Sequence, residues 1–250
     1  MRPTTPCLLL SLTLSLLAPA ADGKPAKGGR KDRPTSPPDP PTSHYEKREL
    51  RGWTLRVNKD LLAKEHEKLY ADVLAELGSH FYRIERAVPA KAVAELKKVV
   101  LWVEYDNPKA RHAHYHPSVG WLKANGYNTD KVKCVELGGA RNFLAATRHQ
   151  PWMILHELAH AYHDQVLGWE QKDVLAAYEA AKAAGTYEKV LIWNGRVGRH
   201  YAMTNHKEYF SETTEAYFGT NDIYPFVKAE LRTHDPKMFE LLGKLWGVEE

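Results

Sequence analysis

Two histidines and a glutamate form the pattern HExxH, His156-Glu157-Leu158-Ala159-His160, within a stretch whose apolar residues recur at helical spacing. Residues four apart lie on one face of a helix, so both imidazoles can bind one divalent cation. Zn2+ accepts such nitrogen ligands and lowers the pKa of a bound water from about 15.7 to about 7. Glu157 can take a proton from that water and pass it to a leaving amine. The pattern predicts a zinc site with a general base, suited to metal-assisted hydrolysis.

A second pair of carboxylates follows downstream, in Glu208-Tyr209-Phe210-Ser211-Glu212. Taken alone, two glutamates four residues apart are typical of a solvated helix face. Beside the histidines, the arrangement resembles that of gluzincin-type zinc peptidases, in which one Glu completes the metal triad and a second acid braces a ligand histidine. Bracing is physically reasonable, because a liganding imidazole usually donates its other N–H to a carboxylate. The resemblance implies that Glu208 is the third zinc ligand and that Glu212 supports a histidine.

Tyr201 lies seven residues before Glu208. With this tyrosine, the segment 150–218 resembles the lethal-factor-like zinc metallopeptidases, whose motif is HExxH followed by a Tyr seven residues before the liganding Glu. The resemblance implies that the Tyr201 hydroxyl stabilises the oxyanion, and that Glu157 acts as the base. It also implies a zincin-like fold, with an HExxH helix, a small mixed sheet and a further helix that carries the third ligand. Where that family usually has Gly before the second histidine, this chain has Ala159.

Other ligand sets are open to test. A metzincin needs a histidine ten residues after the first, where this chain has Val166, so that class is excluded. Asp222, in Gly219-Thr220-Asn221-Asp222, partly matches the aspzincin pattern and is an alternative third ligand. His163 could add a contact to the ion, and Asp164 is either a support for a ligand or an exposed acid. The alternating histidines of a predicted loop could chelate a second metal; they are His112, His114 and His116.

The elements that must position these residues follow from periodicity. The sequence predicts strands over 49–57, 99–105 and 132–137, a loop over 106–120 and a hairpin around Asn194-Gly195. Helices are predicted over 61–77, 90–98, 121–126, 151–167, 170–184, 206–218 and from Asp235-Pro236 to about Trp246. Few strands and many helices in mixed order predict a single α+β domain over 44–250.

The residues before this domain indicate export. Arg2, an apolar run from Cys7 to Leu17 and Ala18-Pro19-Ala20 are typical of a secretory signal peptide over 1–21, and the run is too short to span a bilayer. Residues 22–43 are rich in Pro, Lys, Gly and Ser and predict a linker. Residues 1–43 carry six of the 35 Lys and Arg and three of the 31 Asp and Glu, so the remainder, with 29 and 28, is nearly neutral. We therefore expect no nucleic-acid partner and no stable membrane insertion after cleavage.

Together these features predict a secreted (extracellular or periplasmic) zinc endopeptidase whose partner is a peptide or protein substrate, bound extended along a strand edge above the HExxH helix. The alternative from another class is a secreted metal-binding or adhesive module with a structural zinc. Four protein ligands would close a structural site, whereas a catalytic site keeps a position for water. The sequence does not indicate an oligomeric state or a cleavage specificity.

Overall fold

The computed structural model describes residues 38–248, which belong to a unit that spans Thr35–Glu250. The predicted signal peptide and residues 22–37 of the predicted linker lie outside the described residues. Within the described residues, no helix has the length and apolar character needed to cross a membrane.

In the described part of the chain, the main sheet has five strands in the order β1-β2-β3-β5-β4. These are β1 (Tyr45–Leu50), β2 (Trp53–Asn58), β3 (Leu101–Val103), β5 (Val135–Leu137) and β4 (Ala113–Tyr115). β2, β3 and β5 run parallel, whereas β1 and β4 are antiparallel to their neighbours. The expectation of an α+β chain with a small mixed sheet is confirmed, and β4 forms one edge of that sheet.

The sheet differs from the sequence prediction at one predicted strand and one predicted loop. The stretch predicted as one strand over 49–57 contains a hairpin turn, because Arg51 and Gly52 adopt φ angles of 51° and 81° that reverse the chain between β1 and β2. The predicted loop over 106–120 contains β4, which pairs with β5. A three-residue strand is too short to produce a readable alternation, so its pairing depends on the neighbouring strand.

The first helices are α1 (Glu67–Ala87), α2 (Ala90–Leu96), α3 (Val119–Ala124) and α4 (Ala140–Ala146). α1 buries one face of residues three or four apart, and it continues past its predicted end near Gly78. Phe81 and Ile84 are fully buried beyond that glycine, so packing of this face outweighs the low helix propensity of Gly78.

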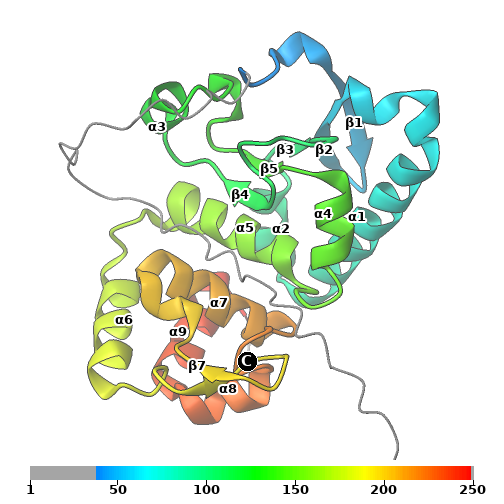
Figure 1. Ribbon diagram of the computed structural model, residues 1–250. Helices are drawn as coiled ribbons and strands as arrows, with labels where there is room; N and C mark the ends of the chain where they lie inside the picture. Colours follow the sequence, from blue (N-terminus) through cyan, green and yellow to red (C-terminus); the bar gives the residue numbers. More distant parts are fainter. Residues whose placement is uncertain (1–37, 249–250) are drawn as a thin grey trace, which may run out of the picture. The chain divides into compact units, whose positions relative to one another are not determined.

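The HExxH stretch forms α5 (Met153–Tyr162), which continues as a π-helical turn, His163–Leu167. The chain then forms α6 (Lys172–Ala184), a short hairpin of β6 (Val190–Leu191) and β7 (Val197–Gly198), α7 (His206–Phe218), α8 (Lys228–His234) and α9 (Pro236–Trp246). Figure 1 shows α5 in the middle of the molecule, between the sheet with α1–α4 and the group of α6–α9. It contacts both β4 and α7. The segments that carry the candidate site therefore meet at this central helix.

A buried polar network lies beside the sheet. The Lys131 ammonium is fully buried and lies 2.8 Å from Asp39 Oδ2, 2.9 Å from Glu104 Oε1 and 2.6 Å from Glu136 Oε1. Asp39, which falls within the predicted linker, also accepts hydrogen bonds from Asn107 and Asn128. The network thus holds the start of the described chain against β3 and β5.

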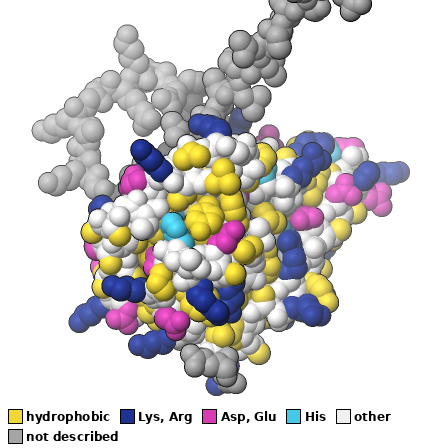
Figure 2. Space-filling model, turned by 90° about the horizontal axis from the view of Figure 1, so that it is seen from below, with side chains coloured by type: hydrophobic (Ala, Val, Ile, Leu, Met, Phe, Trp, Pro, Cys, Tyr) yellow, Lys and Arg dark blue, Asp and Glu magenta, His cyan; other side chains and the backbone are white. Residues whose placement is uncertain are grey.

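The face of the molecule seen in Figure 2 carries Lys and Arg side chains interspersed with acidic and apolar ones. Charges of both signs are thus mixed over this face, as expected for a domain of nearly balanced charge.

Candidate metal centre

α5 places the two motif histidines one turn apart on the same face. Their Nε2 atoms lie 3.1 Å from each other, and each side chain is 12% exposed. Ile154, Leu155 and Leu158, on the remaining helix surface, are fully buried. These apolar side chains anchor the helix in the core, and the two histidines lie on the helix face that is partly exposed to solvent.

α7 supplies the third side chain. Glu208 Oε2 lies 3.2 Å from Nε2 of both His156 and His160. Asn205 caps the helix just before it, accepting hydrogen bonds from the backbone N–H groups of Lys207 and Glu208. Among the described residues, these three offer ligand atoms within 4.8 Å of one another. The alternative that Glu208 lies on a solvated helix face is excluded, since Glu208 is buried.

Electrostatics at this point favour a cation. Burial alone would raise the pKa of Glu208, but the two imidazoles outweigh it and hold that pKa well below its ordinary range. Burial would lower the pKa of His156, but Glu208 and Glu215 outweigh it and raise that pKa well above its ordinary value. A histidine surrounded by buried carboxylates marks a strongly negative environment, in which a divalent cation can replace the proton.

The outer nitrogen of each histidine is also engaged. His156 Nδ1 lies 2.8 Å from Glu215 Oε1, and His160 Nδ1 lies 3.0 Å from Ser211 Oγ. Once a cation has replaced the Nε2 proton, Nδ1 can donate to these partners while each Nε2 lone pair is directed to the cation, the arrangement that metal-binding histidines require. Two imidazoles and one carboxylate suit zinc. The residues present therefore fit the cation that the sequence predicts.

Glu212 lies near the histidine that it is predicted to support, but Glu215 lies closer to that histidine. Glu212 Oε1 lies 3.8 Å from His156 Nδ1, farther than that of Glu215, and its Oε2 accepts a hydrogen bond of 2.9 Å from Asn221. Burial and the charge of Glu215 raise the pKa of Glu212 well above its ordinary value. Sequence reasoning missed Glu215, although its position seven residues after Glu208 returns to the same helix face after two turns.

Glu157 lies next to the first histidine and contacts the sheet. Its Oε2 accepts a hydrogen bond of 2.7 Å from the backbone N–H of Tyr115, on the edge strand β4. Tyr201 begins a 3-10 helix, Tyr201–Thr204, which lies between the hairpin predicted around Asn194-Gly195 and α7. Burial and the nearby Glu208 carboxylate raise the pKa of the Tyr201 hydroxyl, which therefore stays protonated and able to donate.

Asp222 is the alternative third ligand that the sequence offers. Asp222 is not part of the group formed by the two histidines in the described residues. Burial and the charge of Glu215 raise the pKa of Asp222 to about 7. Its charge interacts with those of Glu215 and Glu212, and Glu215 contacts Nδ1 of His156, whereas Glu208 faces Nε2.

The remaining histidines have other surroundings. His116 Nε2 lies 2.6 Å from Glu136 in the buried network, whereas His112 is exposed. Within residues 38–248, the alternating histidines do not form a metal-binding group. His163 is fully buried, and burial lowers its pKa to about 3, so it is neutral and packs against Trp169 and Phe210.

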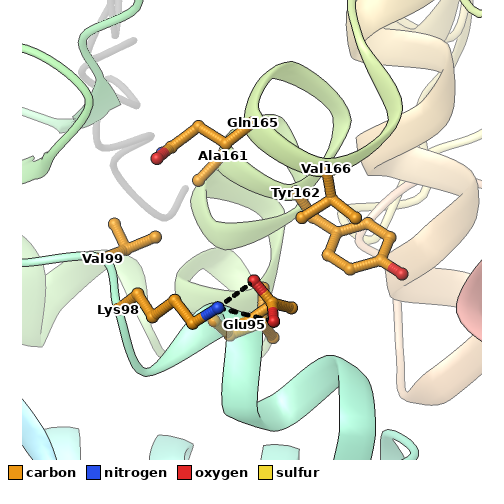
Figure 3. Close-up of a pocket in the computed structure, with 8 residues that line it drawn as sticks. Glu95, Lys98, Val99, Ala161, Tyr162, Gln165 and Val166 are labelled. Carbon is orange, nitrogen blue, oxygen red and sulfur yellow. Dashed lines mark hydrogen bonds and ion pairs between the residues drawn. The ribbon is translucent and has the colours of Figure 1, made fainter.

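A separate pocket of about 120 Å³ lies between the end of α2 and the π-helical turn (Figure 3). Its charged residues, Glu95 and Lys98, pair with each other at 2.6 Å. The lining contains none of the candidate metal ligands. This pocket is therefore not the place where a substrate would meet the metal centre.

Comparisons with known proteins identify no family. No family model and no curated protein matches the chain. Among solved structures, the chain is similar to the Pro-Pro endopeptidase PPEP-2 from Paenibacillus alvei, with 17% sequence identity over 68% of this chain and 89% of that chain and a TM-score of 0.39. A likeness of this extent does not assign a family, so the resemblance to lethal-factor-like peptidases stays a prediction.

Proposed function

We propose that this protein is a secreted, zinc-dependent endopeptidase of the gluzincin type. The observation that carries the proposal is the convergence of His156, His160 and Glu208 beside Glu157. The two Nε2 atoms lie 3.1 Å apart, and each lies 3.2 Å from Glu208 Oε2. Export is supported by the apolar run from Cys7 to Leu17 and its small-residue exit, which lie outside the described residues.

The proposed roles follow from the chemistry of each side chain. When bound, zinc supplies Lewis-acid chemistry: it lowers the pKa of water from about 15.7 to about 7 and polarises a carbonyl oxygen. The Glu157 carboxylate takes the proton from the attacking water and returns it to the leaving amine. The protonated Tyr201 hydroxyl donates a hydrogen bond to the oxyanion that develops on the carbonyl.

The substrate is proposed to be an extended peptide. β4 forms the edge of the sheet, and its Tyr115 N–H points to Glu157. An unpaired strand edge can pair with the backbone of another chain, which would run past the metal centre and expose its carbonyl groups to it.

A structural zinc is less well supported. Such a site is closed by four protein ligands. In the described residues, the group around the two Nε2 atoms contains three, and Glu157 stands next to it. The set is therefore one ligand short of a structural site and suits a catalytic one.

The first experiment is Glu157→Gln. Purified protein is incubated with a mixed peptide library, with and without a chelator, and its zinc content is measured. We expect the variant to retain zinc and to lose at least about 100-fold in kcat, because a positioned general base contributes about 10²–10⁴-fold. The control is Glu170→Gln, an equal change at an exposed glutamate. Unchanged turnover in Glu157→Gln would refute the base assignment, and chelator-insensitive hydrolysis would refute the zinc mechanism.

A further inference from the structure

Tyr115 contacts the HExxH helix at two points. Its backbone N–H donates to Glu157 Oε2 at 2.7 Å, and its hydroxyl donates to Asp164 Oδ2 at 2.7 Å. Glu157 and Asp164 are seven residues apart, which brings them back to the same side of the helix after two turns. One residue of the edge strand therefore spans the helix from its catalytic glutamate to its end.

The second contact is reinforced by its neighbours. Lys133, just before β5, forms an ion pair with Asp164, and Gln165 Nε2 donates to the Tyr115 hydroxyl at 3.1 Å. Asp164 and Gln165 lie in the π-helical turn that ends the helix. We call Tyr115, Lys133, Asp164 and Gln165 the helix–strand clamp. π-Helical turns are rare and often mark functional positions, here by directing two polar side chains to one tyrosine.

The geometry of β4 explains why a clamp matters there. His116 N donates to Cys134 O and Gly138 N donates to His112 O, so these residues of the strand pair with β5. The backbone N–H groups of successive strand residues point to opposite sides, so the N–H of Tyr115 points to the open edge of the sheet. The three-residue strand is thus paired on one side only. The clamp fixes the Tyr115 end of the strand to the helix.

Burial makes these bonds effective. Tyr115 is 8% exposed, as is the side chain of Asp164. Burial and the hydrogen bond to Asp164 raise the pKa of the Tyr115 hydroxyl, which keeps its proton and remains a donor. A hydrogen bond to a carboxylate in such surroundings is stronger than one between neutral groups in water.

We propose that Tyr115 is a positioning residue for the general base: the clamp holds the 115 amide against Glu157 Oε2 and so directs the other carboxylate oxygen to the attacking water. The inference rests on the proposed function only for its effect on turnover. The clamp itself, and the position of the 115 amide, can be measured without any substrate.

The kinetic test removes the hydroxyl while keeping the ring. For Tyr115→Phe we expect kcat to fall about tenfold, the effect of one lost hydrogen bond to a charged group, with KM and zinc content unchanged. Asp164→Asn keeps an acceptor and should retain most of kcat, whereas Asp164→Ala should match Tyr115→Phe. The Tyr115→Phe/Asp164→Ala double variant should be no slower than either single one. The control is Tyr127→Phe, which removes a hydroxyl that donates to Lys109 O at 2.9 Å, outside the clamp.

The substrate-free test is hydrogen exchange of the backbone amide at position 115. In Tyr115→Phe we expect this amide to exchange about tenfold faster, while the His116 amide, bonded to Cys134 O, is unchanged. Unchanged exchange at 115 overturns the inference, as does an unchanged kcat or a kcat loss that accompanies loss of zinc. If the wild-type protein hydrolyses no peptide, the proposed function has failed. The exchange rates still decide whether the clamp positions Glu157.

Discussion

The three glutamates of α7 illustrate how one residue type takes different roles within two helical turns. Glu208 faces two imidazoles and has a strongly lowered pKa, whereas Glu212, facing other carboxylates and Asn221, has a raised one. Glu215 lies against the outer nitrogen of His156. The pKa of Glu208 is therefore set by the imidazoles of α5, and that of Glu212 by burial and by Glu215 on its own helix.

Ligand identity can be separated by zinc content. Glu208→Ala removes one of three converging ligand atoms, and we expect zinc affinity to fall by more than about 100-fold, beyond the 10–100-fold typical of supporting residues. Asp222→Ala should leave zinc content unchanged, because Asp222 is not part of the group that His156, His160 and Glu208 form in the described residues. The measurement is bound zinc after competition with a chelator of known affinity. Zinc loss in Asp222→Ala alone would favour the aspzincin alternative.

Tyr201→Phe tests the oxyanion role. Burial and the nearby Glu208 raise the pKa of the hydroxyl, which therefore stays protonated at neutral pH. Because loss of one oxyanion donor typically costs about 10²–10³-fold, we expect kcat to fall in that range while bound zinc and KM stay near wild-type values. Steady-state kinetics on a peptide found with the library, together with metal analysis, make the comparison. A parallel loss of zinc would assign Tyr201 to the metal site instead.

Spacing was enough to select His156, Glu157 and His160, because helical period places them on a defined face, whereas Glu208 was selected only through the resemblance to gluzincin-type and lethal-factor-like peptidases. The partners of these residues could not be selected in the same way. Ser211 and Tyr115 reach the site from α7 and β4, whose distance from α5 is set by tertiary packing. Local sequence carries no record of that packing, so the candidate ligands could be named from the sequence and most of the residues that contact them could not.

At the scale of elements, α7 and α9 were predicted closely, whereas the bounds of α1 were not. α7 begins and ends at the predicted residues, 206–218, and α9 begins at Pro236 as predicted. Several short elements were missed: β4, α4 and α8 have three to seven residues each. An element of one or two turns contains too few residues for a period to emerge, so long-range contacts determine it.

The contact between α5 and α7 depends on Gly219. A Cβ on this glycine, which follows α7, would come within 2.0 Å of Cε2 of Trp152, the buried residue that precedes α5. We expect Gly219→Ala to lower the free energy of unfolding by roughly 1–3 kcal/mol, the usual cost of overpacking, and to weaken zinc binding as the two helices separate. Urea unfolding and zinc competition measure both effects.

Gly78→Ala is the matched control for this change. Gly78 lies inside α1, and a Cβ there would meet no atom within 4 Å. Alanine should therefore raise stability by up to about 1 kcal/mol through helix propensity and leave zinc binding unchanged. Equal effects of the two substitutions would contradict a specific role for the contact between Gly219 and Trp152.

At the scale of the whole molecule, the buried Lys131 network joins parts that are distant in sequence. It connects Asp39, near the start of the described chain, to Glu104 after β3 and to Glu136 on β5. Through His116, bonded to Glu136, it also reaches the end of β4. The sheet edge at the metal centre is thus held by a charged network on one side and by the helix–strand clamp on the other.

This network makes stability depend on pH through Glu136. Burial alone would raise the pKa of Glu136, but the hydrogen bond with His116 and the charge of Lys131 outweigh it and lower the pKa to about 2, from an ordinary value of 4.5. A lowered folded-state pKa contributes stability that is present above the unfolded value and is lost as pH falls from about 4.5 to about 2. The difference corresponds to on the order of 3 kcal/mol.

Glu136→Gln isolates that contribution, because glutamine keeps the shape of the protonated acid and cannot ionise. We expect wild-type protein to exceed the variant in free energy of unfolding by on the order of 3 kcal/mol at pH 7, and the gap to shrink steadily below pH 4.5. Urea unfolding at pH 7, 5 and 3.5 measures it. The control Glu240→Gln removes an exposed charge and should change stability little at any of these pH values. A gap that stays constant with pH would mean that Glu136 acts through packing, because only its ionisation can make the gap close in acid.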